Sequence, residues 1–240
     1  MRMIHRFGTI ESTMLEAARF AASGAAEGTV IVAEEQTAGQ GRLGRYWHSE
    51  KGSGLYLTEI LRPNLPAESL PLVTLSLGLA TAEAISAVSG AACDLRWPND
   101  VLMGNKKCAG ILAQHTDDFL LAGIGINVNQ SVFPEHLVSI AVSLRIATGR
   151  EHSREDLLAA LLVSIDSHLE VLYRDGRESV LTAFTQASSY VSGRRVIVEN
   201  GATGMRGITE GLDPQGFLKL RLDDGTRRLV VAGGVRPECS

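Results

Sequence analysis

Residues 35–54 read EQTAGQGRLGRYWHSEKGSG, a polar stretch between two apolar, β-branched runs. These runs predict strands at residues 29–34 and 55–61. The five glycines of the stretch permit positive φ angles and let backbone N–H groups approach an anion, and Arg42 and Arg45 add permanent positive charge. A connection of this length inside a compact domain is functional or disordered. The stretch alone leaves two interpretations open: a ligand loop for an anion, or a mobile hairpin connection with solvated arginines.

Hydrophobic periodicity predicts helices and strands throughout residues 1–189. A strand over residues 4–11 precedes a helix that Ser12 or Thr13 can cap. Further helices are predicted at residues 72–88, 154–174 and 178–188, and further strands at residues 95–97, 101–103, 107–114 and 119–127. Because hairpins join most of these strands, the predicted fold class is α+β, a mixed and mainly antiparallel sheet with helices on one face.

After Tyr190 the pattern changes to short β runs separated by glycine, asparagine and Asp-Gly turns. This pattern predicts a small barrel of about 50 residues. We therefore divide the chain into a larger domain, residues 1–189, and a smaller C-terminal domain, residues 190–240.

Composition narrows the class of protein. The 240 residues carry a formal net charge of −4, which argues against nucleic-acid binding over the whole surface. Cys93, Cys108 and Cys239 lie far apart without a CxxC pair, so neither a metal cage nor a disulfide framework is expected, and a reducing compartment is the default. The N-terminus lacks a continuous apolar signal region. The most apolar segment, residues 72–87, contains five polar residues and is not expected to span a bilayer. These features predict a soluble, cytoplasmic protein.

Two later motifs accompany the glycine-rich stretch. LRWPNDVLMGNKKCAGIL occupies residues 95–112, and AGIGINVN occupies residues 122–129. In this order and spacing, the three motifs resemble those of the biotin protein ligases, also called biotin–acetyl-CoA-carboxylase ligases. The resemblance extends from Glu11 to the C-terminus. It implies the class II synthetase-like catalytic domain of that family, followed by an SH3-like barrel.

Some members of this family also act as transcriptional repressors. Those members carry an additional N-terminal helix-turn-helix domain. In this chain the motifs begin within about a dozen residues of Met1. The resemblance is therefore to the monofunctional type, and no nucleic-acid or membrane partner is expected.

The resemblance implies an ATP-dependent reaction in two steps. The biotin carboxylate attacks the α-phosphate of ATP to give biotinyl-5′-AMP and pyrophosphate, and a lysine of a biotin carboxyl carrier protein then attacks the mixed anhydride. The first step brings two anions together, and unit charges about 4 Å apart interact by roughly 4 kcal/mol at an effective dielectric near 20. Cations must offset this repulsion. The expected catalytic cations are Lys107, Arg42, Arg45 and Arg96.

The resemblance also implies ligand contacts residue by residue. Biotin contacts are expected from Ser12, Thr13, Gln36, Gln40, Gly41, Arg42 and Lys107. ATP contacts are expected from Arg42, Arg45, Trp47, Asn99, Asn127 and Asn129, and Asp100 is expected to hold Mg²⁺ on the phosphates.

This chain departs from the family pattern at three positions. Met14 replaces an asparagine that contacts the ureido ring of biotin, and Gln40 replaces an arginine found in many members. Val235 stands where members often have the glutamate of a Gly-Gly-Glu sequence. For this reason no ligand contact is assigned to the C-terminal barrel.

Several of these residues have an ordinary structural alternative. The alternatives are helix capping for Ser12 and Thr13, core packing for Trp47, turn formation for Asn99 and Asp100, and a solvated edge-strand position for Lys107. The neighbouring Lys106 is expected to point to the opposite face of the same strand.

Two other functions remain open from the residues alone. A lipoate or octanoate protein ligase of similar fold would have no use for a ureido contact at Gln36. A non-catalytic biotin or adenylate sensor would not need Lys107 and Arg42. A homodimer formed through sheet edges is a further hypothesis drawn from the family.

Overall fold

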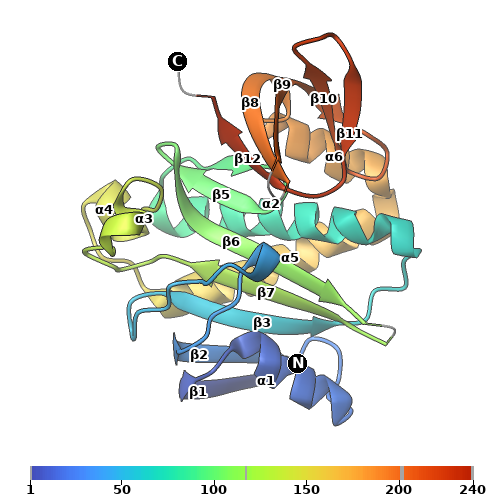
Figure 1. Cartoon of the computed structure of the whole chain (residues 1–240). Coiled ribbons are helices and arrows are strands. Elements are labelled where there is room, and N and C mark those ends of the chain that lie inside the picture. Colours follow the sequence, from blue (N-terminus) through green and yellow to red (C-terminus); the bar gives the residue numbers. More distant parts are fainter. Residues whose placement is uncertain (1, 117, 201–202, 239–240) are drawn as a thin grey trace.

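The computed structural model describes residues 2–116, 118–200 and 203–238. Its larger sheet has seven strands in the order β1-β2-β3-β7-β6-β5-β4 (Figure 1). β1 and β2 run parallel, and the other neighbouring pairs are antiparallel. The strands are β1 (Ile4–Ile10), β2 (Val30–Gln36), β3 (Leu55–Leu61), β4 (Asp94–Arg96), β5 (Asp100–Met103), β6 (Lys106–His115) and β7 (Leu120–Ile126). The expected mixed, mainly antiparallel sheet is confirmed.

Helices cover both faces of this sheet. On one face lie α2 (Leu70–Ser89) and α5 (Arg154–Asp175), which pack along each other, with α6 (Arg177–Gln186) beside them. On the other face, α1 (Thr13–Ala22) buries Met14, Ala17 and Ala21 in a small apolar cluster with residues of β2, β3 and β7. The expectation of helices on one face is therefore wrong for α1. Its short apolar stripe needs a second surface of the sheet to cover it.

The long helix α2 is a core element. By length and composition it could cross a membrane, with a mean hydropathy of 1.5, so its five polar residues do not exclude a span as expected. However, 67% of the apolar window is buried inside the protein. Ser76, Thr81 and Ser89 are among its buried residues, and the Thr81 hydroxyl donates to the Leu77 carbonyl of the same helix at 2.7 Å.

The C-terminal segment forms a second, five-stranded antiparallel sheet in the order β11-β10-β9-β8-β12. Its strands are β8 (Ser192–Asn200), β9 (Thr203–Leu212), β10 (Leu218–Leu222), β11 (Arg227–Val230) and β12 (Gly234–Pro237). The small β domain is thus present, although no pairing of β11 with β12 closes it into a barrel within residues 203–238. Its core is continuous with that of the larger sheet. One direct link is the Trp97 indole N–H, which donates to the Gly216 carbonyl at 2.8 Å.

Short elements complete the chain. They are the 3₁₀ turns η1 (Arg42–Gly44) and η2 (Ala67–Ser69) and the helices α3 (Glu135–Val138) and α4 (Leu144–Thr148). The first of these turns lies in the connection between β2 and β3, residues 37–54, which we call the glycine-rich loop. In Figure 1 this loop, in blue, crosses the sheet in front of β6 and β7.

Candidate functional site

The glycine-rich loop folds back on itself as a miniature hairpin. The Gly41 amide donates to the Arg45 carbonyl at 2.7 Å, and the Trp47 amide donates to the Gly39 carbonyl at 2.8 Å. At the tip, Leu43 and Gly44 have φ angles of 58° and 70°, which permits the tight reversal. The loop is therefore an ordered arm that carries its arginines and Trp47 over the sheet.

Trp47 lies on a platform made by two glycines of β6 and β7. A methyl group at Gly125 would come within 2.5 Å of the indole, and one at Gly110 would come within 3.0 Å of it. The Lys107 ammonium lies 5.2 Å from the centre of the Trp47 ring, a cation–π contact. The indole N–H is buried without a hydrogen-bond partner among the described residues. A glycine inside a strand often marks a close approach, and that signal could have identified this platform in the sequence.

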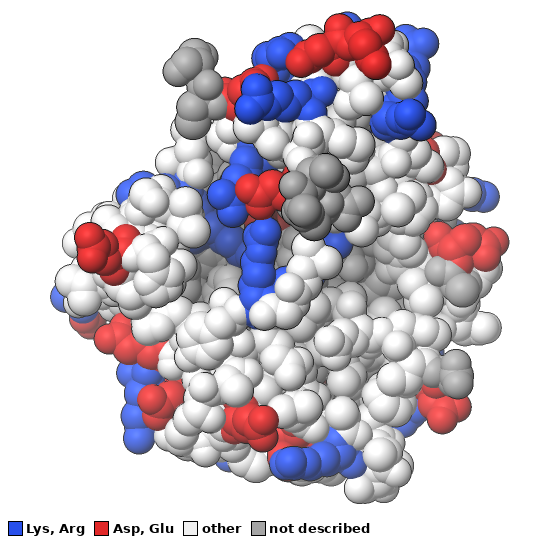
Figure 2. All heavy atoms as spheres, viewed as in Figure 1, with Lys and Arg blue, Asp and Glu red and all other residues white. Residues whose placement is uncertain are grey.

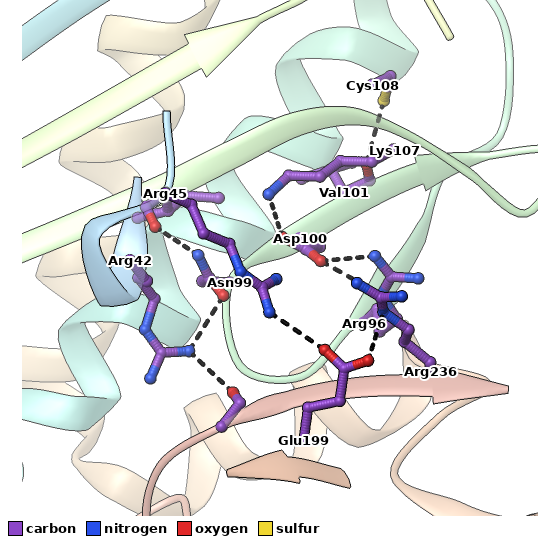
Figure 3. Close-up of polar contacts among 12 residues, drawn as sticks. Arg42, Arg45, Arg96, Asn99, Asp100, Val101, Lys107, Cys108, Glu199 and Arg236 are labelled. Atoms are coloured by element: carbon purple, nitrogen blue, oxygen red, sulfur yellow. Dashed lines mark hydrogen bonds and ion pairs between the residues drawn. The ribbon is translucent and has the colours of Figure 1, made fainter. Parts of the chain in front are cut away.

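Lys107 and Arg96 share one carboxylate, that of Asp100. Lys107 Nζ lies 2.5 Å from Asp100 Oδ1, and Arg96 Nη2 lies 2.7 Å from Oδ2 (Figure 3). Burial alone would raise the pKa of Asp100, but the charges of Lys107 and Arg96 outweigh it and hold the pKa below its ordinary value. Asp100 is therefore an internal counter-ion for two of the expected cations. Lys106 points away, as expected, and donates to the Val138 carbonyl at 2.8 Å.

The two loop arginines both reach the C-terminal sheet. Arg42 donates to Asn99 Oδ1 at 3.2 Å and to the Gly233 carbonyl at 3.3 Å, and Arg45 pairs with Glu199 at 3.1 Å (Figure 3). Burial lowers the pKa of Arg42, Arg45 lowers it further, and Asp100 partly offsets both effects. The C-terminal domain, to which no ligand contact was assigned, therefore contacts two of the expected site arginines. Sequence gave no signal for Glu199, because it lies 154 residues from Arg45.

Figure 2 shows the charged side chains on the face of the molecule that the glycine-rich loop crosses. Lys and Arg side chains gather in the middle of this face, and acidic side chains lie among them. This mixture of charges agrees with the pairs described above, since Asp100 pairs with Arg96 and Lys107 and Glu199 pairs with Arg45. This face thus carries a local group of cations, although the chain as a whole has a formal net charge of −4.

A buried polar network lies at the other end of the site. Gln36 Oε1 accepts from the Thr13 amide at 2.8 Å and from the Thr13 hydroxyl at 3.0 Å, while Gln36 Nε2 donates to Ser49 at 3.0 Å. The Thr58 hydroxyl donates to Thr13 at 2.9 Å. Ser12 caps α1 by accepting from the Met14 amide at 3.2 Å. Ser49 and Thr58 were not predicted, because their role depends on pairing across the sheet.

One hollow is lined both by residues of this network and by Lys107. Among the expected residues, it is lined by Thr13, Gln36, Gln40, Gly41, Arg42, Trp47, Asn99 and Lys107. Its remaining walls are largely apolar or glycine: Met14, Leu57, Gly110, Ile111, Leu112, Gly123, Ile124 and Gly125. Ser12, Arg45, Arg96, Asp100, Asn127 and Asn129 do not line it. The hollow thus combines polar and apolar walls, with neutral polar residues such as Gln36 and the cations Arg42 and Lys107 in its lining.

Comparison with known proteins identifies the family. Residues 7–138 match the biotin/lipoate A/B protein ligase family, and residues 191–235 match the biotin protein ligase C-terminal domain. The bifunctional ligase/repressor BirA of Bacillus spizizenii is 36% identical over 235 residues, covering 93% of this chain and 70% of the relative. The chain belongs to the biotin protein ligase family. A biotin–[acetyl-CoA-carboxylase] ligase of Mycobacterium tuberculosis is also 36% identical, over 89% of this chain and 80% of its own length.

Solved structures agree with this assignment. The biotin protein ligase of Aquifex aeolicus in complex with biotin and ATP has a TM-score of 0.86 and 30% sequence identity. The match covers 98% of this ligase and 97% of that chain. The fold of this ligase, including its C-terminal sheet, is therefore that of the family.

Asn127 and Asn129, the expected ATP contacts at the end of β7, both bond to the backbone in this ligase. The Asn127 amide donates to the Val142 carbonyl at 3.2 Å and to the Lys107 carbonyl at 3.4 Å. Asn129 is bonded at both ends to the backbone of His152, at 2.9 and 3.0 Å. These bonds fasten the strand end to the following segments, and among the hydrogen bonds described they leave Asn127 Oδ1 and one Asn129 N–H available to a ligand.

The expected Mg²⁺ contact at Asp100 disagrees with the geometry. Both carboxylate oxygens of Asp100 already pair with cations, and a metal ion would have to displace them. Among the described residues, no group of three or more His, Cys, Asp or Glu side chains could hold a metal ion. The residues present therefore do not fit a protein-held Mg²⁺ at Asp100, because two positive charges occupy its ligand positions.

Proposed function

We propose that this ligase joins biotin to ATP, giving biotinyl-5′-AMP and pyrophosphate, and then transfers the biotinyl group to a lysine of an acceptor protein. In the second step the lysine amine forms an amide bond to the biotin carbonyl, and AMP leaves. The hollow carries the proposal, since its lining combines neutral polar residues with cations in a chain of this family. The choice of biotin and ATP as ligands is supported by the similarity to the biotin protein ligase of Aquifex aeolicus, whose solved structure is a complex with both.

The ureido ring of biotin is assigned to the Thr13–Gln36 end. Gln36 uses both lone pairs of its oxygen and one N–H within the network, which leaves its second N–H for a ligand carbonyl among the bonds described. Met14 offers only a thioether here, so the ring makes fewer polar contacts than the family pattern implies.

The reacting carboxylate and α-phosphate are assigned to Lys107 and Arg42 at the cationic end. Lys107 is a compact charge that can leave Asp100 and follow an incoming anion, whereas Arg42 presents several donors in a planar fork. The unpartnered Trp47 N–H beside them would gain an acceptor from the same anion. Arg45 and Arg96 stand behind this pair and add positive potential.

The loop has a second task in this proposal. Biotinyl-5′-AMP is a mixed anhydride that water would hydrolyse, and the hairpin with Trp47 covers the floor of the hollow. Asn127 and Asn129 are proposed to contact ATP from the end of β7, as the family resemblance implies, while their backbone bonds hold that strand end in place.

The acceptor is proposed to be a biotin carboxyl carrier protein or domain, as the family implies. We also propose a cytoplasmic location, a possible homodimer through sheet edges, and function without nucleic acid or a membrane. The division into residues 1–189 and 190–240 belongs to the same proposal, supported by the change to the second sheet after Val191.

The test is incubation with ATP, Mg²⁺ and a biotin carrier domain, with biotin in one sample and lipoate in another. Mass spectrometry of the carrier should show addition of one biotinyl group and no lipoyl group. Efficient lipoyl addition would favour a lipoate ligase. Failure to release pyrophosphate with biotin would favour a sensor.

A further inference from the structure

The C-terminal sheet holds the glycine-rich loop through a single carboxylate, that of Glu199. This residue lies near the end of β8, and its two oxygens face two arginines. One oxygen pairs with Arg45 of the loop at 3.1 Å, and the other pairs with Arg236 of β12 at 3.2 Å (Figure 3). Its side chain is 35% exposed, so it can be replaced without opening the core.

The neighbouring strand completes a seat for the loop. Glu199 lies opposite Gly234 in the pairing of β8 with β12. A methyl group at Gly234 would lie 3.8 Å from the Arg45 guanidinium, and the adjacent Gly233 carbonyl accepts from Arg42. Arg42 and Arg45 therefore approach the C-terminal domain at two consecutive residues, Gly233 and Gly234.

Charge explains why a carboxylate is needed at this position. Arg45 and Arg236 both meet at Glu199, Arg42 binds the nearby Gly233 carbonyl, and like charges repel one another. Asp100 is already shared by Arg96 and Lys107. Among the described contacts, Glu199 is the carboxylate that offsets the charge of Arg45, so removing it would leave the loop tip held to the C-terminal domain by Arg42 alone.

We propose that Glu199 is a positioning residue, which holds Arg45 and the tip of the glycine-rich loop against the C-terminal sheet before ATP arrives. The loop is then presented as an ordered arm, and ATP does not have to order it on binding. This inference rests on the proposed ATP-dependent function, because it assigns the pre-ordered arm to nucleotide capture.

The chain offers a matched control. Glu210 on β9 of the same sheet also pairs with two arginines, Arg221 at 2.8 Å and Arg227 at 2.9 Å. Neither partner belongs to the glycine-rich loop. Glu210→Gln therefore removes an equivalent exposed charge pair from the same domain without touching the loop.

The experiment compares wild type, Glu199→Gln and Glu210→Gln in the full chain. Trypsin cleavage after Arg42 and Arg45, followed by mass spectrometry without ligand, should be about two- to fivefold faster for Glu199→Gln, as expected from loss of an exposed ion pair. The KM for ATP should rise by a similar factor, while the KM for biotin and kcat stay close to wild type. Glu210→Gln should match wild type in every measurement.

Several outcomes would overturn the inference. One is equal cleavage of Glu199→Gln and wild type, and another is an ATP KM that is unchanged or lower in Glu199→Gln, which would make Glu199 a competitor for Arg45. A parallel change in Glu210→Gln would also count against it. Failure of the proposed function itself is distinguishable, because wild type would then release no pyrophosphate, while the trypsin measurement would still report on the loop.

Discussion

Among single residues, the adjacent Lys106 and Lys107 lie in different surroundings: Lys107 faces the candidate site and Lys106 does not. Alternation along β6 sends Lys107 toward Asp100 and Trp47 and sends Lys106 to the Val138 carbonyl. The two differ in surroundings, although both are lysines on one strand. Strand geometry predicted that the two lysines point to opposite faces, and the family resemblance predicted which of them belongs to the site. Neither source alone distinguishes a site lysine from a solvated one.

We expect Lys107→Ala to lower kcat/KM for biotin adenylation by about a hundredfold or more, since a preorganised cation at a developing charge contributes on this order. Lys106→Ala should retain most of the activity, because it loses only an exposed bond to a backbone carbonyl. Biotin-dependent pyrophosphate release measures both variants. Equal activity of the two would contradict the assignment of Lys107.

At the scale of elements, the loop and the sheet depend on each other through glycine. Gly110 and Gly125 were not predicted as a platform, although their positions inside strands offered a clue. The sequence indicated a functional loop from its glycines and arginines, but the surface that receives the loop is built by strands far along the chain. Such a contact follows from sheet order, which places β6 beside β7.

Gly125→Ala should displace Trp47 and reduce adenylation by at least about tenfold. The added methyl group would lie 2.5 Å from the indole, and small misplacements of reacting groups cost this much or more. Tryptophan emission should shift to longer wavelength as Trp47 leaves its seat, against a constant contribution from the buried Trp97.

Gly8→Ala is the matched control, because Gly8 is also a strand glycine but a methyl group there would meet nothing within 4 Å. Its emission and activity should equal those of wild type. An unchanged emission spectrum in Gly125→Ala would contradict the proposed seat of Trp47.

In the molecule as a whole, Arg2 near the N-terminus links the sheet to helix α5 through the buried carboxylate of Glu59 and the carboxylate of Asp166. Glu59 on β3 is 1% exposed and accepts from Arg2 at 2.8 Å, and Arg2 also pairs with Asp166 of α5 at 2.6 Å. Burial raises the pKa of Glu59 above its ordinary value, although Arg2 lowers it in part. The folded state therefore holds this proton more tightly than the unfolded state.

The sign of the pH dependence follows from this difference. Glu59 contributes stability that is fully present below the ordinary glutamate pKa, about 4.3, and is lost as pH rises through the higher folded pKa. In Glu59→Gln this loss is absent, so the free energy of unfolding of wild type relative to the variant should fall as pH rises across that window. Urea denaturation at a series of pH values measures it.

Glu155→Gln serves as the control for the loss of a carboxylate in general, since Glu155 is 68% exposed and pairs with Arg6 on the surface. No comparable change across the window is expected for this variant. A relative stability of Glu59→Gln that does not vary with pH would show that burial of Glu59 does not shift its protonation.

The sequence predicted much of this architecture and part of the site. The strands from residue 94 to residue 126 lie within one or two residues of their predicted bounds, because alternation and turn residues are local signals. The rest of the site depends on which segments lie side by side in the folded chain. This holds for the helix on the second face of the sheet, for the roles of Ser49, Thr58 and Glu199, and for the backbone bonds of Asn127 and Asn129. The local sequence pattern carries no information about such contacts between distant segments.

The central claim is that Lys107 and Arg42 hold the joined carboxylate and phosphate at one end of the hollow while Thr13 and Gln36 hold the ring at the other. A crystal structure with a non-hydrolysable analogue of biotinyl-5′-AMP tests it most directly. The phosphate should lie within hydrogen-bonding distance, about 3 Å, of Lys107 Nζ, with the ring beside Gln36. An analogue bound away from the hollow, with Lys107 still paired to Asp100, would contradict it.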